Sequence, residues 1–140
     1  MSITFDRVSD LSGGPTMALI DEIDPGLSIR AVDRLADEVA PTDKSFKYQF
    51  VSRPTYARRK AQGPIKGRLS KTESDRVVRF ARVWEFALRV WKSEGAARAF
   101  LGRPHMLLEG RTPLAVTLSG EQGGRMVEDV LGRLYHGTGV

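Results

Sequence analysis

SKTESDRVVRFARVWEFALRVW, residues 70–91, is the stretch of sequence that decides the fold. Ser70, followed three positions later by Glu73, forms a capping box, which marks the start of an α-helix. The spacing of the apolar residues predicts a helix over about residues 71–92. Its apolar face is so wide that other helices are expected to cover it on two sides. We expect Trp84 and Trp91 to be largely buried. One apolar stripe contains Val77, Ala81, Trp84, Leu88 and Trp91, and the next contains Phe80, Val83, Ala87 and Val90. The polar residues opposite these stripes are Arg79, Arg82, Glu85 and Arg89.

Three helices are expected upstream of this scaffold. The first is amphipathic and stops before Pro41, because its apolar residues recur at a spacing of about 3.6, at Ile29, Val32, Leu35, Ala36 and Val39. Thr42 or Asp43 can cap the next helix, which is expected to run through Phe46 and Phe50.

Ser52 can cap a third helix, with Arg53-Pro54 in its first turn, where proline is tolerated. The sequence Gly63-Pro64 is expected to end it. Three short helices with tight links, the third of them basic, are typical of a helix-turn-helix domain.

Charge is distributed unevenly along the chain. Residues 1–43 have a balance of −6, residues 44–72 carry nine basic residues and no acidic one, and residues 73–140 have a balance of +2. A local block of this kind attracts polyanions more strongly than the overall charge of +5 suggests, which favours a nucleic acid as the partner. The alternative is a basic surface that is merely solvated.

The third helix has side chains suited to the major groove of DNA. Arg53 and Thr55, near its start, could reach base edges, whereas Arg58, Arg59 and Lys60 could neutralise phosphates. An exposed basic helix that serves another partner is the alternative interpretation. Tyr56, between these residues, is expected to pack in the core rather than to stack on a base.

Downstream of the scaffold, three further helices are expected. Ser93-Glu94 opens a short one that ends at Gly102 and Pro104, and Thr112 with Pro113 marks the start of the next. The last helix is expected over about residues 121–135, ended by Gly137. Its apolar face carries Met126, Val127, Val130, Leu131, Leu134 and Tyr135.

No constellation of residues supports catalysis. The chain contains no cysteine, which excludes disulfides and zinc–thiolate sites, and its two histidines, His105 and His136, are far apart in the sequence. His105 is expected to cap or pack a helix. The glycines of 119–124 precede a helix but lack the lysine of a phosphate-binding loop. We therefore expect no enzyme activity, no metal and no cofactor.

Neither a membrane span nor a secretory signal is expected. No apolar run approaches the roughly 18 residues that a span requires. Residues 1–12 contain Asp6 and Asp10 and lack an apolar core region. We therefore expect a cytoplasmic protein that does not bind membranes.

Several segments together resemble the Xre/MbcA/ParS family of antitoxins, whose toxin partners carry a RES domain. The resemblance covers about residues 28–140. It begins at 73–83, continues through 97–105, and is strongest at Gly110-Arg111-Thr112-Pro113-Leu114 and at 127–134. Upstream, residues 55–60 resemble the family's basic recognition helix.

The resemblance implies an all-α fold in which an N-terminal helix-turn-helix (Xre/Cro-like) shares a long central helix with a small helical toxin-binding domain. We expect an arm over 1–19, the DNA-binding domain over 20–83 and the toxin-binding domain over 84–140. The implied function is that of a type II antitoxin: it occludes the active site of an NAD-consuming RES-domain toxin, forms a homodimer and represses its own operon at an operator DNA. The residues expected to bind the toxin are Arg111, Arg133, Tyr135, His136, Gly137 and Val140.

One feature departs from the family pattern. Phe50-Val51 stands where the family has a turn glycine before the recognition helix, which leaves the turn geometry open. The alternative function is a helix-turn-helix transcription regulator without a toxin partner, whose C-terminal half only dimerises. A neighbouring gene for a RES-like toxin would separate the two functions.

Overall fold

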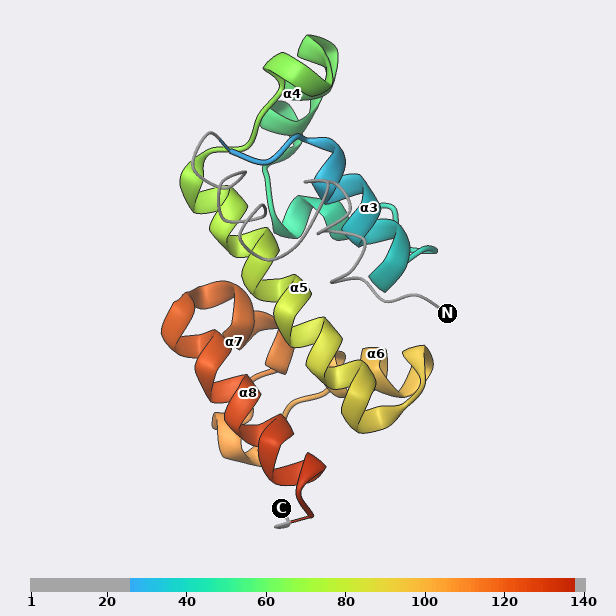
Figure 1. Cartoon of the computed structure of the whole chain (residues 1–140), viewed down its shortest axis with the longest axis vertical. Helices are drawn as coiled ribbons and strands as arrows, with labels where there is room; N and C mark the ends of the chain where they lie inside the picture. The colour runs from blue at the N-terminus through green and yellow to red at the C-terminus, as the bar shows by residue number, and fades with distance from the viewer. Residues whose placement is uncertain (1–25, 138–140) are drawn as a thin grey trace. The chain divides into compact units, whose positions relative to one another are not determined.

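The computed structural model describes residues 26–137, so the expected arm over 1–19 and Val140 lie outside the described residues. The chain divides into two compact units, Met1–Val78 and Arg79–Val140, and the boundary falls inside one long helix (Figure 1). The elements are α3 (Arg30–Val39), the 3₁₀ turn η1 (Phe46–Gln49), α4 (Arg53–Lys66), α5 (Lys71–Trp91), α6 (Glu94–Gly102), the 3₁₀ turn η2 (Met106–Leu108), α7 (Pro113–Ser119) and α8 (Glu121–Tyr135). Extended pairing in this part of the chain is limited to one isolated bridge, between Ser28 and Arg68.

In the first unit, α3 is the predicted amphipathic helix. Its predicted apolar residues are all buried: Ile29, Val32, Leu35, Ala36 and Val39. The second predicted helix is wrong in type and in cap. It is only the short turn η1, because Asp43 accepts hydrogen bonds from the backbone N–H and the hydroxyl of Ser45, at 3.0 and 2.7 Å, and does not cap a helix. Phe46 and Phe50 still reach the core and meet edge to face, with ring centroids 5.6 Å apart.

The predicted start of α4 is confirmed, and its end is less simple than predicted. Ser52 is the N-cap, with proline in the first turn. The regular helix breaks at Gly63, which has φ +87°, and a further turn continues to Lys66. Backbone hydrogen bonds then join the segment after α4 to the start of α3, from Ile29 N–H to Gly67 O at 2.9 Å and from Leu69 N–H to Leu27 O at 2.8 Å.

The capping box at the start of α5 is confirmed. The Ser70 hydroxyl accepts from the Glu73 backbone N–H at 3.1 Å, and the Glu73 carboxylate accepts from the Ser70 backbone N–H at 2.8 Å. The buried Ser74 hydroxyl accepts from the Leu27 N–H at 3.0 Å. The first turns of α5 are thus fixed in the first unit by hydrogen bonds as well as by the buried Val77.

In the second unit, the rest of α5 is covered by the helices that follow it, and its two tryptophans have different environments. Trp84 is 0% exposed, as predicted, but Trp91 is 39% exposed, so its predicted burial is wrong. Trp91 is the last residue of α5, and the backbone turns away directly after it at Lys92, which has φ +60°. The Trp91 ring therefore packs only partly, against Phe100 at 5.9 Å between ring centroids.

The environments of two arginines of α5 also differ from the solvent-facing positions that the sequence predicts. Arg79 is not on a solvent-facing side but buried, where its Nε donates to the Thr117 carbonyl at 2.7 Å near the end of α7. A cation is favourable there because the last carbonyls of a helix lack intrahelical donors. Arg82 pairs with Glu121 and Glu128 of α8, at 3.1 and 2.8 Å. The polar side of α5 is thus a packing surface for α7 and α8.

The glycines at the start of α8 have a packing role. A Cβ on Gly123 would lie 2.0 Å from the Val116 carbonyl oxygen of α7, and one on Gly124 would lie 2.8 Å from the buried Arg79 side chain. Both glycines are inside a helix that lies directly against α7 (Figure 1). The glycine run therefore allows close approach of neighbouring chain segments.

Candidate functional site

The start of α4 is a capped and exposed helix N-terminus. The Ser52 hydroxyl accepts from the Thr55 N–H at 3.3 Å and donates to the Thr55 hydroxyl at 2.9 Å. Arg53 and Pro54 are exposed, and the Arg53 guanidinium stacks over the Tyr48 ring at 4.2 Å. This end of α4 therefore presents the Arg53 guanidinium and the Ser52 and Thr55 hydroxyls at the positive end of the helix dipole, a combination suited to an anionic ligand.

The turn before α4 is built from buried apolar residues. Phe50 and Val51 are 1% and 4% exposed, and Phe50 has ordinary negative φ of −105°. Arg76 of α5 donates to the Phe50 carbonyl at 2.8 Å. Because the turn uses no left-handed residue at Phe50, the missing glycine does not distort the approach to α4.

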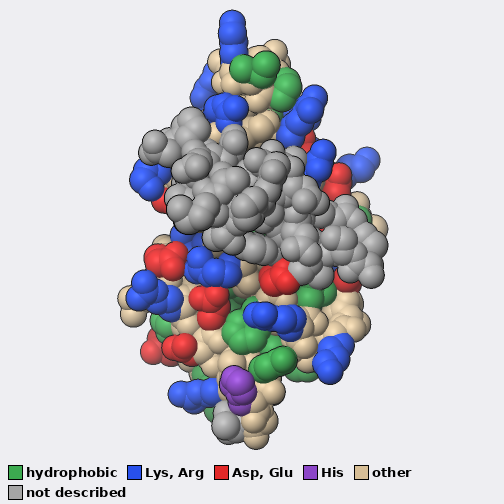
Figure 2. Space-filling model, viewed as in Figure 1, with side chains coloured by type: hydrophobic (Ala, Val, Ile, Leu, Met, Phe, Trp, Pro, Cys, Tyr) green, Lys and Arg blue, Asp and Glu red, His purple; other side chains and the backbone are tan. Residues whose placement is uncertain are grey.

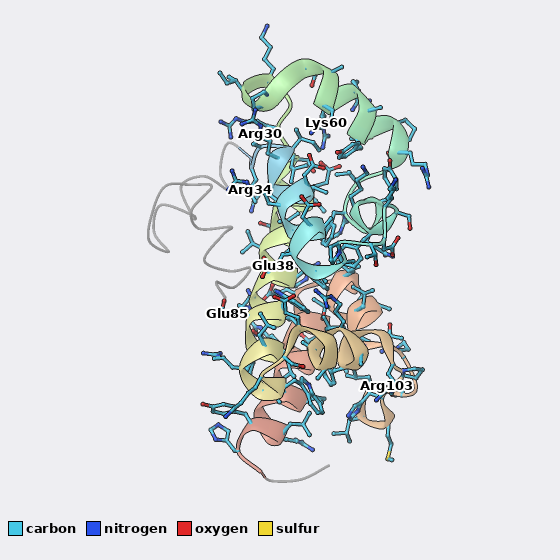
Figure 3. All side chains as sticks on the ribbon, turned by 90° about the vertical axis from the view of Figure 1, so that its right-hand side faces the viewer. Arg30, Arg34, Glu38, Lys60, Glu85 and Arg103 are labelled. Carbon is cyan, nitrogen blue, oxygen red and sulfur yellow. The ribbon has the colours of Figure 1, made fainter. Side chains whose placement is uncertain are left out.

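The basic residues of α4 have different partners. Arg58 is exposed, whereas Arg59 forms an ion pair with Glu73 of α5 and Lys60 forms one with Asp33 of α3, at 2.7 Å in the latter case. Figure 3 labels Lys60 where α4 passes α3, and Figure 2 shows lysine and arginine side chains around α4. Two of the five residues predicted to bind DNA, Arg59 and Lys60, are therefore ion-paired within the unit.

These contacts shift the pKa values of two groups, the Glu73 carboxyl and the Tyr56 hydroxyl. Partial burial acts to raise the pKa of Glu73, but the backbone N–H of Ser70 and the Arg59 guanidinium outweigh it and hold that pKa below its ordinary value. Burial, together with a hydrogen bond donated to Asp33, raises the pKa of the Tyr56 hydroxyl. Tyr56 is half-buried between Asp33 and Lys47, whose Nζ lies 4.5 Å from the ring centroid, so it packs against the unit without entering the buried core that was predicted for it.

The residues predicted to bind the toxin come from two segments of the second unit. Tyr135 and His136 lie together at the end of α8, with ring centroids 5.3 Å apart, and Tyr135 also meets Phe86 of α5 at 6.2 Å. The helix ends as predicted at Gly137, which has φ +68°. Arg133 is exposed one turn earlier and borders a shallow depression with Leu107 and Met126.

Arg111 is on a separate segment, the loop before α7. Its side chain is exposed, and its backbone is fixed on both sides by hydrogen bonds, from its own N–H to the Leu108 carbonyl and from the His105 N–H to its carbonyl, each 3.1 Å long. The ring of His105 accepts from the Leu107 N–H at 3.1 Å as the N-cap of η2, which confirms its predicted capping role. Thr112 caps α7 as predicted.

Apart from Tyr135, sequence reasoning missed the large apolar side chains that are exposed in the second unit. Of the five large apolar side chains exposed among residues 26–137, four are in this unit: Trp91, Met106, Leu107 and Tyr135. Trp91 also borders a groove of about 450 Å³, whose other walls include Phe100, Leu134 and Arg103. The sequence feature that could have indicated the exposure of Trp91 is its position at the very end of its helix, where no further helical turn packs beside the apolar stripe.

Two structural findings concern other classes of site. No described helix combines the length and apolar character that crossing a membrane requires. Residues 26–137 contain no group of three or more histidine, aspartate or glutamate side chains that could hold a metal ion.

The chain matches known proteins along most of its length. Residues 18–82 match the family model of the antitoxin Xre-like helix-turn-helix domain, and residues 87–137 match that of the antitoxin Xre/MbcA/ParS C-terminal toxin-binding domain. Antitoxin Xre of Yersinia enterocolitica serotype O:8 / biotype 1B is 29% identical over 122 residues, which span 86% of this chain and 80% of that protein.

The fold and these matches define an all-helical protein with an N-terminal helix-turn-helix domain and a C-terminal toxin-binding domain, which confirms the predicted fold class. The chain belongs to the Xre/MbcA/ParS family of antitoxins. This family is regulatory rather than catalytic. Its two domains imply a toxin and DNA as binding partners.

Proposed function

We propose that this antitoxin binds a RES-domain toxin with its second unit and occludes the cleft in which the toxin consumes NAD. The observation that carries the proposal is the exposure of Trp91, Met106, Leu107 and Tyr135 on one small domain that matches a toxin-binding family. Large apolar side chains beside arginines are typical of the energetically important centres of protein interfaces. The family resemblance supports a RES domain as the partner.

The end of α8 is proposed to lie against the toxin's active site. Arg133, Tyr135 and His136 are exposed there, and Gly137 stops the helix, so that the chain beyond it, including Val140, would enter the cleft. Arg111 would contact the toxin from the loop before α7. Occlusion of this kind is steric and requires no catalytic group in the antitoxin.

The first unit is proposed to repress the antitoxin's own operon as part of a homodimer. Residues 44–72 supply nine cations and no carboxylate, and α4 presents Arg53, Thr55 and Arg58 near an exposed helix surface. Arg53 and Thr55 would contact base edges, and Arg58 would contact phosphate. Two copies would place two such helices on neighbouring half-sites.

Co-expression with the adjacent gene tests the toxin proposal. A toxin expressed alone is expected to lower cellular NAD and to stop growth, and the antitoxin is expected to restore both and to co-purify with it. If the adjacent product neither lowers NAD nor co-purifies, the RES-toxin proposal is wrong. A control in which Arg58→Gln replaces the wild type should still neutralise, because Arg58 belongs to the DNA-binding unit.

A further inference from the structure

Helix α4 is attached to the first unit by polar side chains rather than by a buried apolar face. None of its residues is buried. Its contacts with α3 and with the start of α5 include those of Tyr56 and Lys60 with Asp33 and of Arg59 with Glu73. Positions 56, 59 and 60 share one face of a helix, because residues three and four apart are neighbours. This face therefore determines how α4 is rotated about its own axis.

Arg59 and Arg58 are adjacent in sequence but have different surroundings. The side chains of Arg59 and Glu73 are only 16% and 17% exposed, whereas Arg58 is exposed. The same Glu73 oxygen also accepts from the Ser70 N–H at 2.8 Å, so the ion pair ends on the capped first turn of α5. If Arg59 moved to contact a DNA phosphate, the Glu73 carboxylate, which is only 17% exposed, would lose its cation, and this is unfavourable.

We propose that Arg59 is a positioning residue of the DNA-binding surface and contacts no phosphate itself. By pairing with Glu73, it fixes α4 on the start of α5 and so directs Arg53, Thr55 and Arg58 toward the DNA. This inference rests on the DNA-binding function proposed above. It reassigns a residue that the sequence alone places among the phosphate contacts.

The test compares Arg58→Gln with Arg59→Gln in the full-length protein. Affinity is measured over a salt series for a duplex from the promoter upstream of the gene and for a random-sequence duplex of equal length. Arg58→Gln is expected to weaken both complexes and to reduce the slope of log K against log salt by about 0.9, the value for one lost phosphate contact. Arg59→Gln is expected to leave the slope unchanged and to lower promoter affinity about tenfold, more than it lowers random-duplex affinity.

Two further variants separate positioning from phosphate contact. Glu73→Gln keeps the capping box but removes the charge, and it should reproduce the effect of Arg59→Gln. Arg59→Lys keeps a cation beside Glu73 and should recover most of the affinity. A slope that falls by about one unit in Arg59→Gln, with Glu73→Gln binding like the wild type, would overturn the inference.

Amide hydrogen exchange in the free protein supplies a readout that does not depend on an operator. Arg59→Gln and Glu73→Gln should speed exchange over Arg53–Lys66, and Arg58→Gln should not. Equal exchange in all three variants would also overturn the inference. If the wild type binds promoter DNA no more tightly than random DNA, autorepression is wrong, and exchange and the random-duplex slope still decide the role of Arg59.

Discussion

Helices α4 and α8 carry the two proposed binding surfaces. The two helices differ in the side chains that attach each of them to its own unit. α4 has no buried residue and uses charged side chains both for its attachment and for its proposed ligand. α8 is attached through the buried residues Gly123, Gly124, Val127, Val130 and Leu131, while Arg133 and Tyr135 remain exposed for a partner. The comparison shows that charged side chains serve both attachment and proposed recognition in α4, whereas α8 has a buried apolar face in addition to the ion pairs of Glu121 and Glu128 with Arg82.

The largest expected effect concerns the apolar core of the second unit. Trp84→Ala should lower the free energy of unfolding by roughly 3–5 kcal/mol, because Trp84 is 0% exposed and its removal leaves a cavity. Trp91→Ala is the matched control and should cost much less, because that side chain is 39% exposed. Urea denaturation measures both. Equal losses for the two variants would contradict the assignment of Trp84 to the core and Trp91 to a binding surface.

A smaller effect on stability is expected from glycine-to-alanine substitutions at two positions in α8. Gly123→Ala should destabilise the protein by about 1–3 kcal/mol, because its Cβ would lie 2.0 Å from the Val116 carbonyl oxygen. Gly132→Ala meets nothing within 4 Å and should stabilise the helix by about 0.4–1 kcal/mol. Thermal unfolding of both variants checks the signs. Stabilisation by Gly123→Ala would show that α8 does not depend on close approach to α7.

The smallest expected effect is a pH dependence confined to the attachment of α4. The pKa of Glu73 is lower in the folded protein than its ordinary value of 4.5, so the carboxylate contributes stability above that value and loses it as the pH falls through the folded pKa. Glu73→Gln should remove this component and flatten the decline in unfolding free energy between neutral pH and about pH 3. An unchanged pH profile in Glu73→Gln would mean that the ion pair with Arg59 adds nothing to stability.

The helix starts could be predicted from sequence because each depends on a local cap. Ser52, Ser93 and Thr112 each accept a backbone N–H in the predicted first turn. The segment before η1 was mispredicted for a related local reason, since Asp43 bonds to Ser45 instead of capping. Periodicity also placed Arg79 on the polar side of α5, because it does not reveal which polar side chains find carbonyl partners.

The kind of ligand that each candidate surface binds could be predicted from sequence, but only some of the residues that form each surface could. Composition locates the cations of 44–72, yet the pairing of Arg59 with Glu73 joins positions 14 residues apart and depends on how α4 folds back on α5. The exposed Met106 and Leu107 lie between two predicted helices, where no apolar periodicity indicates whether a side chain is buried. Their exposure follows from the brief turn η2, which is too short to bury more than Leu108.

The central claim is that the two units bind different partners through separate surfaces, and reciprocal binding measurements test it most directly. One variant combines Arg53→Gln with Arg58→Gln, and the other combines Trp91→Ala with Tyr135→Ala. Dissociation constants are measured for the promoter duplex and for the purified product of the adjacent gene. The first variant should lose at least about tenfold in DNA affinity and bind the toxin as the wild type does. The second should lose about 30-fold or more in toxin affinity and keep its DNA affinity, whereas equal losses for both partners in either folded variant would contradict the account.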